Sequence, residues 1–115
     1  MQRSRISELD IAEVLKAAYE NTPGHFPQYK ADFKEIYHPV IEKALREIFY
    51  VVPAPKTNDE TSIKNKINVF DIRNVCMKVF NDLEANGLEM QMYFKDVFET
   101  PITKALQSTF EITPF

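Results

Sequence analysis

The chain has 115 residues, of which 44% are hydrophobic and 27% are charged, and its formal net charge is −3 at pH 7. These values are typical of one globular domain with enough apolar side chains for a core. Positive and negative residues are interspersed, which excludes a broad basic surface for nucleic acid, and two glycines are too few for a β-rich domain.

Neither membrane insertion nor secretion is indicated by the sequence. No apolar run approaches the roughly 18 residues that suggest a membrane span. A secretory signal has an apolar region after its positively charged residues. The N-terminal stretch MQRSRISELD has no such region after its arginines. The single cysteine, Cys76, cannot form an internal disulfide. We therefore expect an intracellular protein, cytoplasmic or nuclear.

A first amphipathic helix is predicted to begin in the stretch SELDIAEV. Ser7 is a suitable N-cap, and Asp10 follows at the spacing of a capping box. The apolar side chains that follow fall on one helical face: Ile11, Val14, Leu15, Ala18 and Tyr19. The breakers Pro23 and Gly24, in NTPG, then end the helix.

The stretch FKEIYHPVIEKALREIF, residues 33–49, predicts a second helix with a wider apolar face. That face consists of Phe33, Ile36, Tyr37, Val40, Ile41, Ala44, Leu45, Ile48 and Phe49. Pro39 lies in the middle, where a proline costs about 3 kcal/mol in a continuous helix. Because the apolar spacing keeps its phase across Pro39, we predict one kinked helix.

An exposed loop around residues 52–66 is predicted next, because VVPAPKTNDETSIKNK is polar, holds two prolines and has no periodicity. A third helix then follows, with Asn68 as its N-cap. Its apolar side chains are Ile72, Val75, Cys76, Val79, Phe80 and Leu83. The sequence EANG ends it, with Gly87 in the position that follows a helix C-terminus.

The fourth predicted helix, FKDVFETPITKALQSTF at residues 94–110, matches the second one without a gap. Pro101 again lies inside it, so two interpretations stay open. The helix is kinked, or it is two short helices with Thr100 as a cap and Pro101 at the first helical position.

Comparison of the two halves at an offset of 61 residues indicates an internal duplication. The two repeats are residues 6–54 and 67–115. The identical pairs in and around the later helix of each repeat are Phe33/Phe94, Lys34/Lys95, Ile41/Ile102, Lys43/Lys104, Ala44/Ala105, Leu45/Leu106, Phe49/Phe110 and Pro53/Pro114. The identical pairs in the earlier part are Ile6/Ile67, Asp10/Asp71, Ile11/Ile72 and Val14/Val75.

We therefore predict an all-α fold in which an antiparallel helical hairpin is duplicated to give four main helices in one domain, residues 1–115. One hairpin cannot bury so wide an apolar face alone, whereas two can share a core. A closed four-helix bundle and a two-unit α-solenoid both satisfy this requirement.

Parts of the chain resemble proteins built from helical repeats. A proline-containing helix within an antiparallel pair is similar to HEAT-type repeats. The segments HPVIEKALREIFYVVPA and YFKDVFETPITKAL resemble helices of exportin-type nuclear transport receptors, and DVFETPITKALQSTF resembles a segment of cullin repeats. These resemblances imply a protein-binding scaffold. The loop and the 61-residue period are longer than in HEAT units, which have about 40 to 47 residues, and no ligand-contacting residue carries over.

The sequence predicts no catalytic, metal-binding or cofactor-binding residue, and we do not expect an enzyme. His38 has only Glu42 at helical ligand spacing, whereas a metal site needs three or four ligands. Cys76 falls in the apolar stripe and is interpreted as a small buried hydrophobic residue. A small basic edge, formed by Arg3, Arg5, Lys64 and Lys66, is interpreted as solvated helix starts, and nucleic acid is not the expected partner.

Positions at which the repeats differ indicate where a partner binds. Four residues of the second repeat differ in character from their equivalents in the first: Met77 replaces Lys16, Met90 replaces Tyr29, Met92 replaces Ala31 and Tyr93 replaces Asp32. These four residues are predicted to border a partner or dimer surface. The alternative is that they pack beneath the Gly87 turn. We expect a non-enzymatic interaction module or scaffold that binds another protein or a peptide helix, or a bundle that acts as a homodimer.

Overall fold

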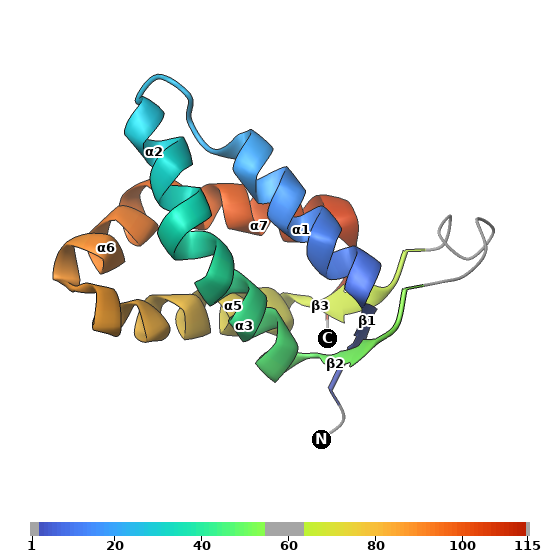
Figure 1. The fold of residues 1–115 in the computed structure, drawn as a ribbon. Coiled ribbons are helices and arrows are strands. Elements are labelled where there is room, and N and C mark those ends of the chain that lie inside the picture. Colours follow the sequence, from blue (N-terminus) through green and yellow to red (C-terminus); the bar gives the residue numbers. More distant parts are fainter. Residues whose placement is uncertain (1–2, 55–63, 115) are drawn as a thin grey trace.

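The computed structural model describes residues 3–54 and 64–114, and it confirms an all-α fold with four main helices (Figure 1). These helices are α1 (Glu8–Asn21), α3 (His38–Ile48), α5 (Val69–Asp82) and α7 (Glu99–Thr109). Among the described residues, none of the helices is long and apolar enough to cross a membrane.

Ser7 and Asn68 are the N-caps of their helices, as predicted, and each forms a capping box, which was predicted only for Ser7. The backbone N–H of Asp10 donates to Ser7 Oγ over 3.2 Å, and the N–H of Ser7 donates to the Asp10 carboxylate over 2.9 Å. Asn68 and Asp71 repeat this exchange at the start of α5, over 2.8 and 3.0 Å. Each box satisfies two backbone donors that a helix N-terminus otherwise leaves without a partner.

The helical segments predicted at residues 33–49 and 94–110 begin earlier than predicted. A short helix precedes each of them, α2 (Pro27–Asp32) in the first half and α6 (Leu88–Tyr93) in the second. Each short helix continues into a single π-helical turn, η1 (Phe33–Tyr37) or η3 (Phe94–Phe98), and then into the main helix. After α5, a 3₁₀ turn (η2, Leu83–Asn86) ends at Gly87, whose φ of 101° favours glycine.

The helical backbone continues through both prolines. In the π turn, the N–H of His38 bonds to the carbonyl of Phe33, five residues back, and Glu99 bonds to Phe94 in the same way. A π turn inserts one extra residue, which is a common adjustment where the regular hydrogen-bond ladder is interrupted. Pro101 therefore lies inside α7, and the alternative of two short helices with Thr100 as a cap is wrong.

The described residues include four strands of three residues each, which were not predicted. Strand β1 (Arg5–Ser7) pairs in parallel with β2 (Tyr50–Val52), and β3 (Lys66–Asn68) pairs in parallel with β4 (Glu111–Thr113). The strands β2 and β3 occupy the ends of the segment that was predicted to be a loop. The remainder of that loop, residues 55–63, lies outside the described residues.

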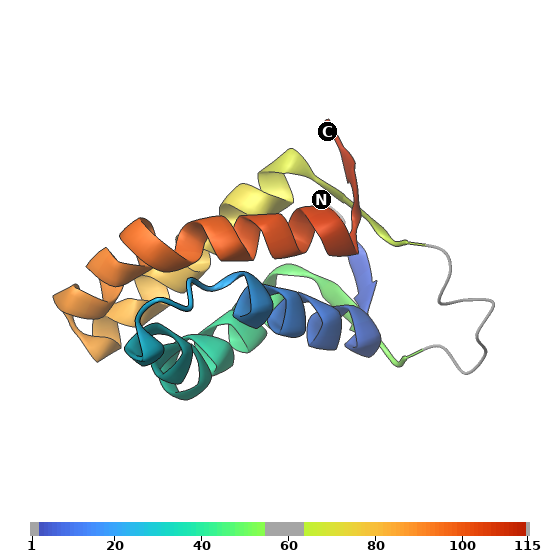
Figure 2. The same ribbon diagram turned by 90° about the horizontal axis from the view of Figure 1, so that it is seen from above.

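Every element of the first half recurs 61 residues later, so we call residues 4–52 the first copy and residues 65–113 the second copy. The copies are interlocked. Helix α1 packs along α7 of the other copy, and α3 packs against α5 (Figures 1 and 2). The packing of helices between copies is more extensive than that within each hairpin. The fold is therefore a closed bundle and not a stack of two separate hairpins.

Equivalent polar contacts join the two copies near the strands. Ser4 Oγ donates to the Asp71 carboxylate over 2.7 Å, and the amide of Asn65, the equivalent of Ser4, donates to Asp10 over 2.6 Å. The capping carboxylate of each copy is thus also held by the other copy. An ion pair of 2.8 Å between Lys78 Nζ on α5 and Glu47 on α3 joins them again.

The aromatic core lies where the copies meet. The rings of Tyr37 and Phe98, which are equivalent residues, stack with centroids 4.0 Å apart, and Phe49 lies 6.2 Å from its equivalent Phe110. All four side chains are buried. The Tyr37 hydroxyl donates to the carbonyl of Met90 over 2.8 Å, and burial raises the pKa of Tyr37 well above its usual range.

Because each copy completes the core of the other, we predict that neither half folds alone. Fragments 1–58 and 59–115 should each show little helical circular dichroism, and an equimolar mixture should regain it. Phe98→Ala in the second fragment should weaken this association, since truncating a buried Phe costs about 3 to 5 kcal/mol. Lys104→Ala, at an exposed position of α7, which follows Phe98, should not. A fragment that is fully helical by itself would contradict the prediction.

Candidate functional site

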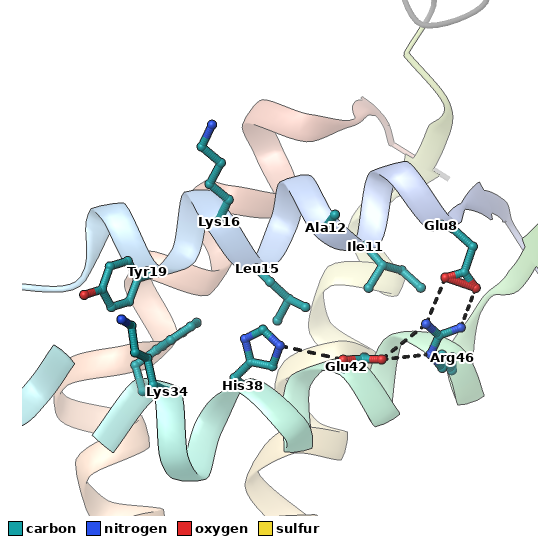
Figure 3. Close-up of a pocket in the computed structure, with 11 residues that line it drawn as sticks. Glu8, Ile11, Ala12, Leu15, Lys16, Tyr19, Lys34, His38, Glu42 and Arg46 are labelled. Atoms are coloured by element: carbon teal, nitrogen blue, oxygen red, sulfur yellow. Dashed lines mark hydrogen bonds and ion pairs between the residues drawn. The ribbon is translucent and has the colours of Figure 1, made fainter. Parts of the chain in front are cut away.

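The main candidate site is a groove between α1 and α3, with a volume of about 490 Å³ (Figure 3). The two helices run antiparallel here, so side chains from both line its length. Its floor is apolar and is formed by Ile11, Leu15 and Phe33, which also belong to the core. The exposed Ala12 lies beside this floor and leaves the groove open.

One end of the groove is bordered by a chain of ion pairs. The Arg46 guanidinium donates to both carboxylate oxygens of Glu8, over 2.6 and 2.9 Å, and to Glu42 over 3.2 and 3.3 Å. His38 Nε2 lies 3.7 Å from the Glu42 carboxylate. The hydrogen bond from Arg46 holds the pKa of Glu8 below its usual range. The bidentate contact links α1 to α3 at this end.

The other end carries lysines and an aromatic ring. Lys34 Nζ lies 5.1 Å from the centroid of the Tyr19 ring, and Lys16 is exposed on the rim. Within the part of the chain that the structure describes, neither lysine has a carboxylate at ion-pair distance. The two ends therefore differ, because the carboxylates at the first end are engaged while the ammonium groups at the second are available.

The equivalent positions of the second copy do not rebuild this charged border. Val69 stands where the first copy has Glu8, Thr103 where it has Glu42, and Gln107 where it has Arg46. Cys76 replaces Leu15, and its thiol lies 3.7 Å from the Thr103 hydroxyl. Partial burial raises the pKa of this thiol, which makes it a poor nucleophile.

The predicted partner-binding residues are not gathered at one place. Met90 and Tyr93 line a small cleft of about 420 Å³ between α2 and α6, together with Phe26 and Tyr29. Both also pack partly against the core. Met77 and Met92 are exposed on α5 and α6 and do not line that cleft. Their role in binding stays a prediction.

The groove residues were missed because their signal is not local in the sequence. Glu8 and Arg46 are 38 positions apart, and no periodicity links them. A clue was present in the comparison of the repeats, since both positions are charged in one copy and neutral in the other. For other chemistry, no group of three or more metal-ligating side chains occurs among residues 3–54 and 64–114.

No family model, curated protein or solved structure matches this chain. The resemblance to HEAT-type repeats therefore stays a prediction, and the site is interpreted from its geometry alone.

We predict that Glu8→Gln makes the stability of the protein less sensitive to acid. Because the pKa of Glu8 is lower in the folded chain than its usual 4.5, the ion pair stabilises the fold above about pH 4.5, and this contribution is lost as the pH falls through the lowered value. The free energy of unfolding from urea titrations at pH 7 and pH 3 should differ less in Glu8→Gln than in the wild type. Glu13→Gln, at an exposed carboxylate of the same helix, should retain the wild-type difference. Equal pH dependence of Glu8→Gln and the wild type would contradict the prediction.

Proposed function

We propose that the protein is a non-enzymatic protein-binding module, and that its groove between α1 and α3 receives an amphipathic, acidic helix of another protein. The observation that supports this proposal is the combination of an apolar floor with two lysines, Lys16 and Lys34, that no carboxylate of the described chain pairs.

The length of the groove suits a helical ligand. It extends along α1 from Glu8 to Tyr19, which corresponds to about 16 Å at about 1.5 Å per residue. Three turns of an incoming helix span that length and present apolar side chains at i, i+3, i+4 and i+7 on one face. Those side chains would cover Ile11 and Leu15, whose neighbour Ala12 leaves room for them.

The charges favour an acidic ligand. Arg46 is already engaged by Glu8 and Glu42, so it offers little to a further carboxylate. Lys16 and Lys34 at the other end retain their donors. An acidic residue on the rim of the incoming helix would pair with them, whereas a basic one would be repelled. Such rim charges select the partner and its orientation more than they add affinity.

The first test is a selection from a displayed library of amphipathic helices. All members share an apolar stripe, and the residues that flank the stripe are random. Helices that bind the wild-type protein and not the Ala12→Glu variant are retained, and we expect them to be enriched in Asp and Glu. A retained set enriched in Lys and Arg, or no helix that depends on Ala12, would overturn the proposal.

We predict that Ala12→Glu weakens binding of a selected peptide by about tenfold or more, because the new carboxylate lies over the apolar floor and repels an acidic ligand. Ala31→Glu is the matched control, since it makes the same change at an exposed helical position outside the groove. Lys16→Glu combined with Lys34→Glu should reverse the preference between acidic and basic versions of the peptide. Fluorescence anisotropy of a labelled peptide measures these affinities. If Ala12→Glu and Ala31→Glu weakened peptide binding equally, the groove would not be the binding site.

A further inference from the structure

The cleft between α2 and α6 lies where the two copies meet and is lined by equivalent positions of both. The equivalent pairs that line it are Tyr29/Met90, Asp32/Tyr93 and Gln28/Glu89. The remaining lining residue is Phe26, which is 54% exposed and whose equivalent is Gly87. The residues of each pair differ in character, although both copies fold alike. A shared fold therefore does not account for the chemistry of this cleft.

Three aromatic rings form walls of the cleft. The rings of Phe26 and Tyr29 are nearly perpendicular, at 82°, with centroids 5.4 Å apart. The rings of Tyr29 and Tyr93 meet at 64°, with centroids 6.4 Å apart. The corner between two crossed rings is bounded by a face of each ring, and ring faces attract a cation that lies within about 6 Å of them. The aromatic walls therefore favour a cation over an uncharged group of the same shape.

Two carboxylates add negative charge to the cleft. Asp32 is only 9% exposed, and the Gln28 amide donates to its Oδ1 over 2.7 Å. Interaction with the Glu89 carboxylate raises the pKa of the Tyr93 hydroxyl, so these two groups lie close together. Among the described residues, neither Asp32 nor Glu89 has a cationic side chain at ion-pair distance. A carboxylate that is buried without a cation is unfavourable, and a cation in the cleft would neutralise it.

We propose that this cleft binds a trimethylammonium group. A plain ammonium has three N–H donors and is strongly hydrated, so its entry requires acceptors that replace its water. The Asp32 carboxylate is already engaged by Gln28, and Glu89 is close to the Tyr93 hydroxyl. A trimethylammonium group has no N–H donor, and ring faces with nearby carboxylates stabilise its charge. The cleft therefore suits the methylated cation better than the plain one.

The carboxylates also restrict what is bonded to the trimethylammonium group. A phosphocholine head group carries a phosphate close to its nitrogen. Asp32 and Glu89 would repel that phosphate, and none of the described residues that line the cleft is Lys or Arg. The ligand is therefore a cation with no anion beside it, as in a trimethylated lysine side chain or in choline. The volume of about 420 Å³ is within the range of small-ligand sites.

NMR of methionine methyl groups tests the proposal, because Met90 lines the cleft and Met77 is exposed outside it. The isotope-labelled protein is titrated with choline and, separately, with trimethyllysine whose amino and carboxyl ends are blocked. The Met90 signal should shift with a dissociation constant on the order of 1 to 10 mM, as expected for ligands with so few atoms, and the Met77 signal should not. Tighter binding of blocked trimethyllysine assigns the site to a modified protein, and tighter binding of choline assigns it to a small molecule.

Two control ligands separate charge from shape. Dimethylbutanol, the uncharged carbon isostere of choline, should bind at least about tenfold more weakly, because it lacks the attraction to ring faces and carboxylates. Phosphocholine should also bind more weakly than choline, because the carboxylates repel its phosphate. Equal binding of choline and dimethylbutanol would overturn the proposal. Tighter binding of phosphocholine than of choline would overturn it too, and would indicate a site for a lipid head group.

Variants of the lining residues locate the binding. Phe26→Ala removes an exposed ring and Asp32→Asn removes a charge at constant shape, so each should weaken choline binding by about threefold or more. Phe70→Ala and Asp96→Asn make the same changes at exposed positions outside the cleft and should leave the affinity unchanged. Circular dichroism melting shows whether each variant is folded. A choline affinity that Phe26→Ala does not change, or a Met90 signal that no trimethylammonium ligand shifts, would contradict the proposal.

The cleft and the groove between α1 and α3 are tested independently. Ala12→Glu, which lies in the groove and not in the cleft, should leave the choline affinity unchanged while it weakens binding of the helical peptide. Phe26→Ala should do the reverse. Failure of the groove and failure of the cleft are therefore separate results.

Discussion

The exchange of packing partners between the two copies is the constraint on which the rest of the structure depends. Tyr37 stacks on its equivalent Phe98. Helix α1 packs on α7, and α3 packs on α5, so each main helix contacts a helix of the other copy. A hairpin with so wide an apolar face has to cover it, and the other copy provides the cover. The capping carboxylates Asp10 and Asp71 follow the same arrangement, because each holds its own helix start and also accepts a hydrogen bond from the opposite copy.

Most of the helical architecture could be predicted from the sequence, because helix capping and apolar spacing are determined by residues close together in the chain. Ser7 and Asn68 begin their helices through short-range capping, and the apolar spacing identifies both long helices and the residues they bury. The strands escaped detection because three residues are too few for a period of two to be recognised. The π turns were not predicted because Pro39 and Pro101 indicate that the helix is irregular but not which hydrogen-bond pattern the backbone adopts there.

The candidate site was harder to predict than the fold because it depends on contacts between distant residues. Arg46 meets Glu8 only after α3 has folded back along α1. Met77 and Met90 were identified by the difference between copies, but that comparison does not place them in space. The backbone carbonyl of Met90 accepts a hydrogen bond from the Tyr37 hydroxyl, whereas the Met77 side chain is exposed on α5. Divergence between repeats therefore locates candidate positions, and packing decides which of them a partner can reach.

A fold in which the same elements occur twice also provides its own reference for what the fold requires. Where equivalent residues are both buried, as Phe33 and Phe94 are, packing explains their identity. Where equivalent residues are both exposed and differ in character, packing does not explain the difference. Lys16 and Met77 occupy equivalent positions on their helices, yet Lys16 borders the groove between α1 and α3, whereas Met77 is an exposed apolar side chain of α5. The two copies therefore share one core while presenting different chemistry to solvent, and the outer faces differ without any change in the interlocked helices beneath.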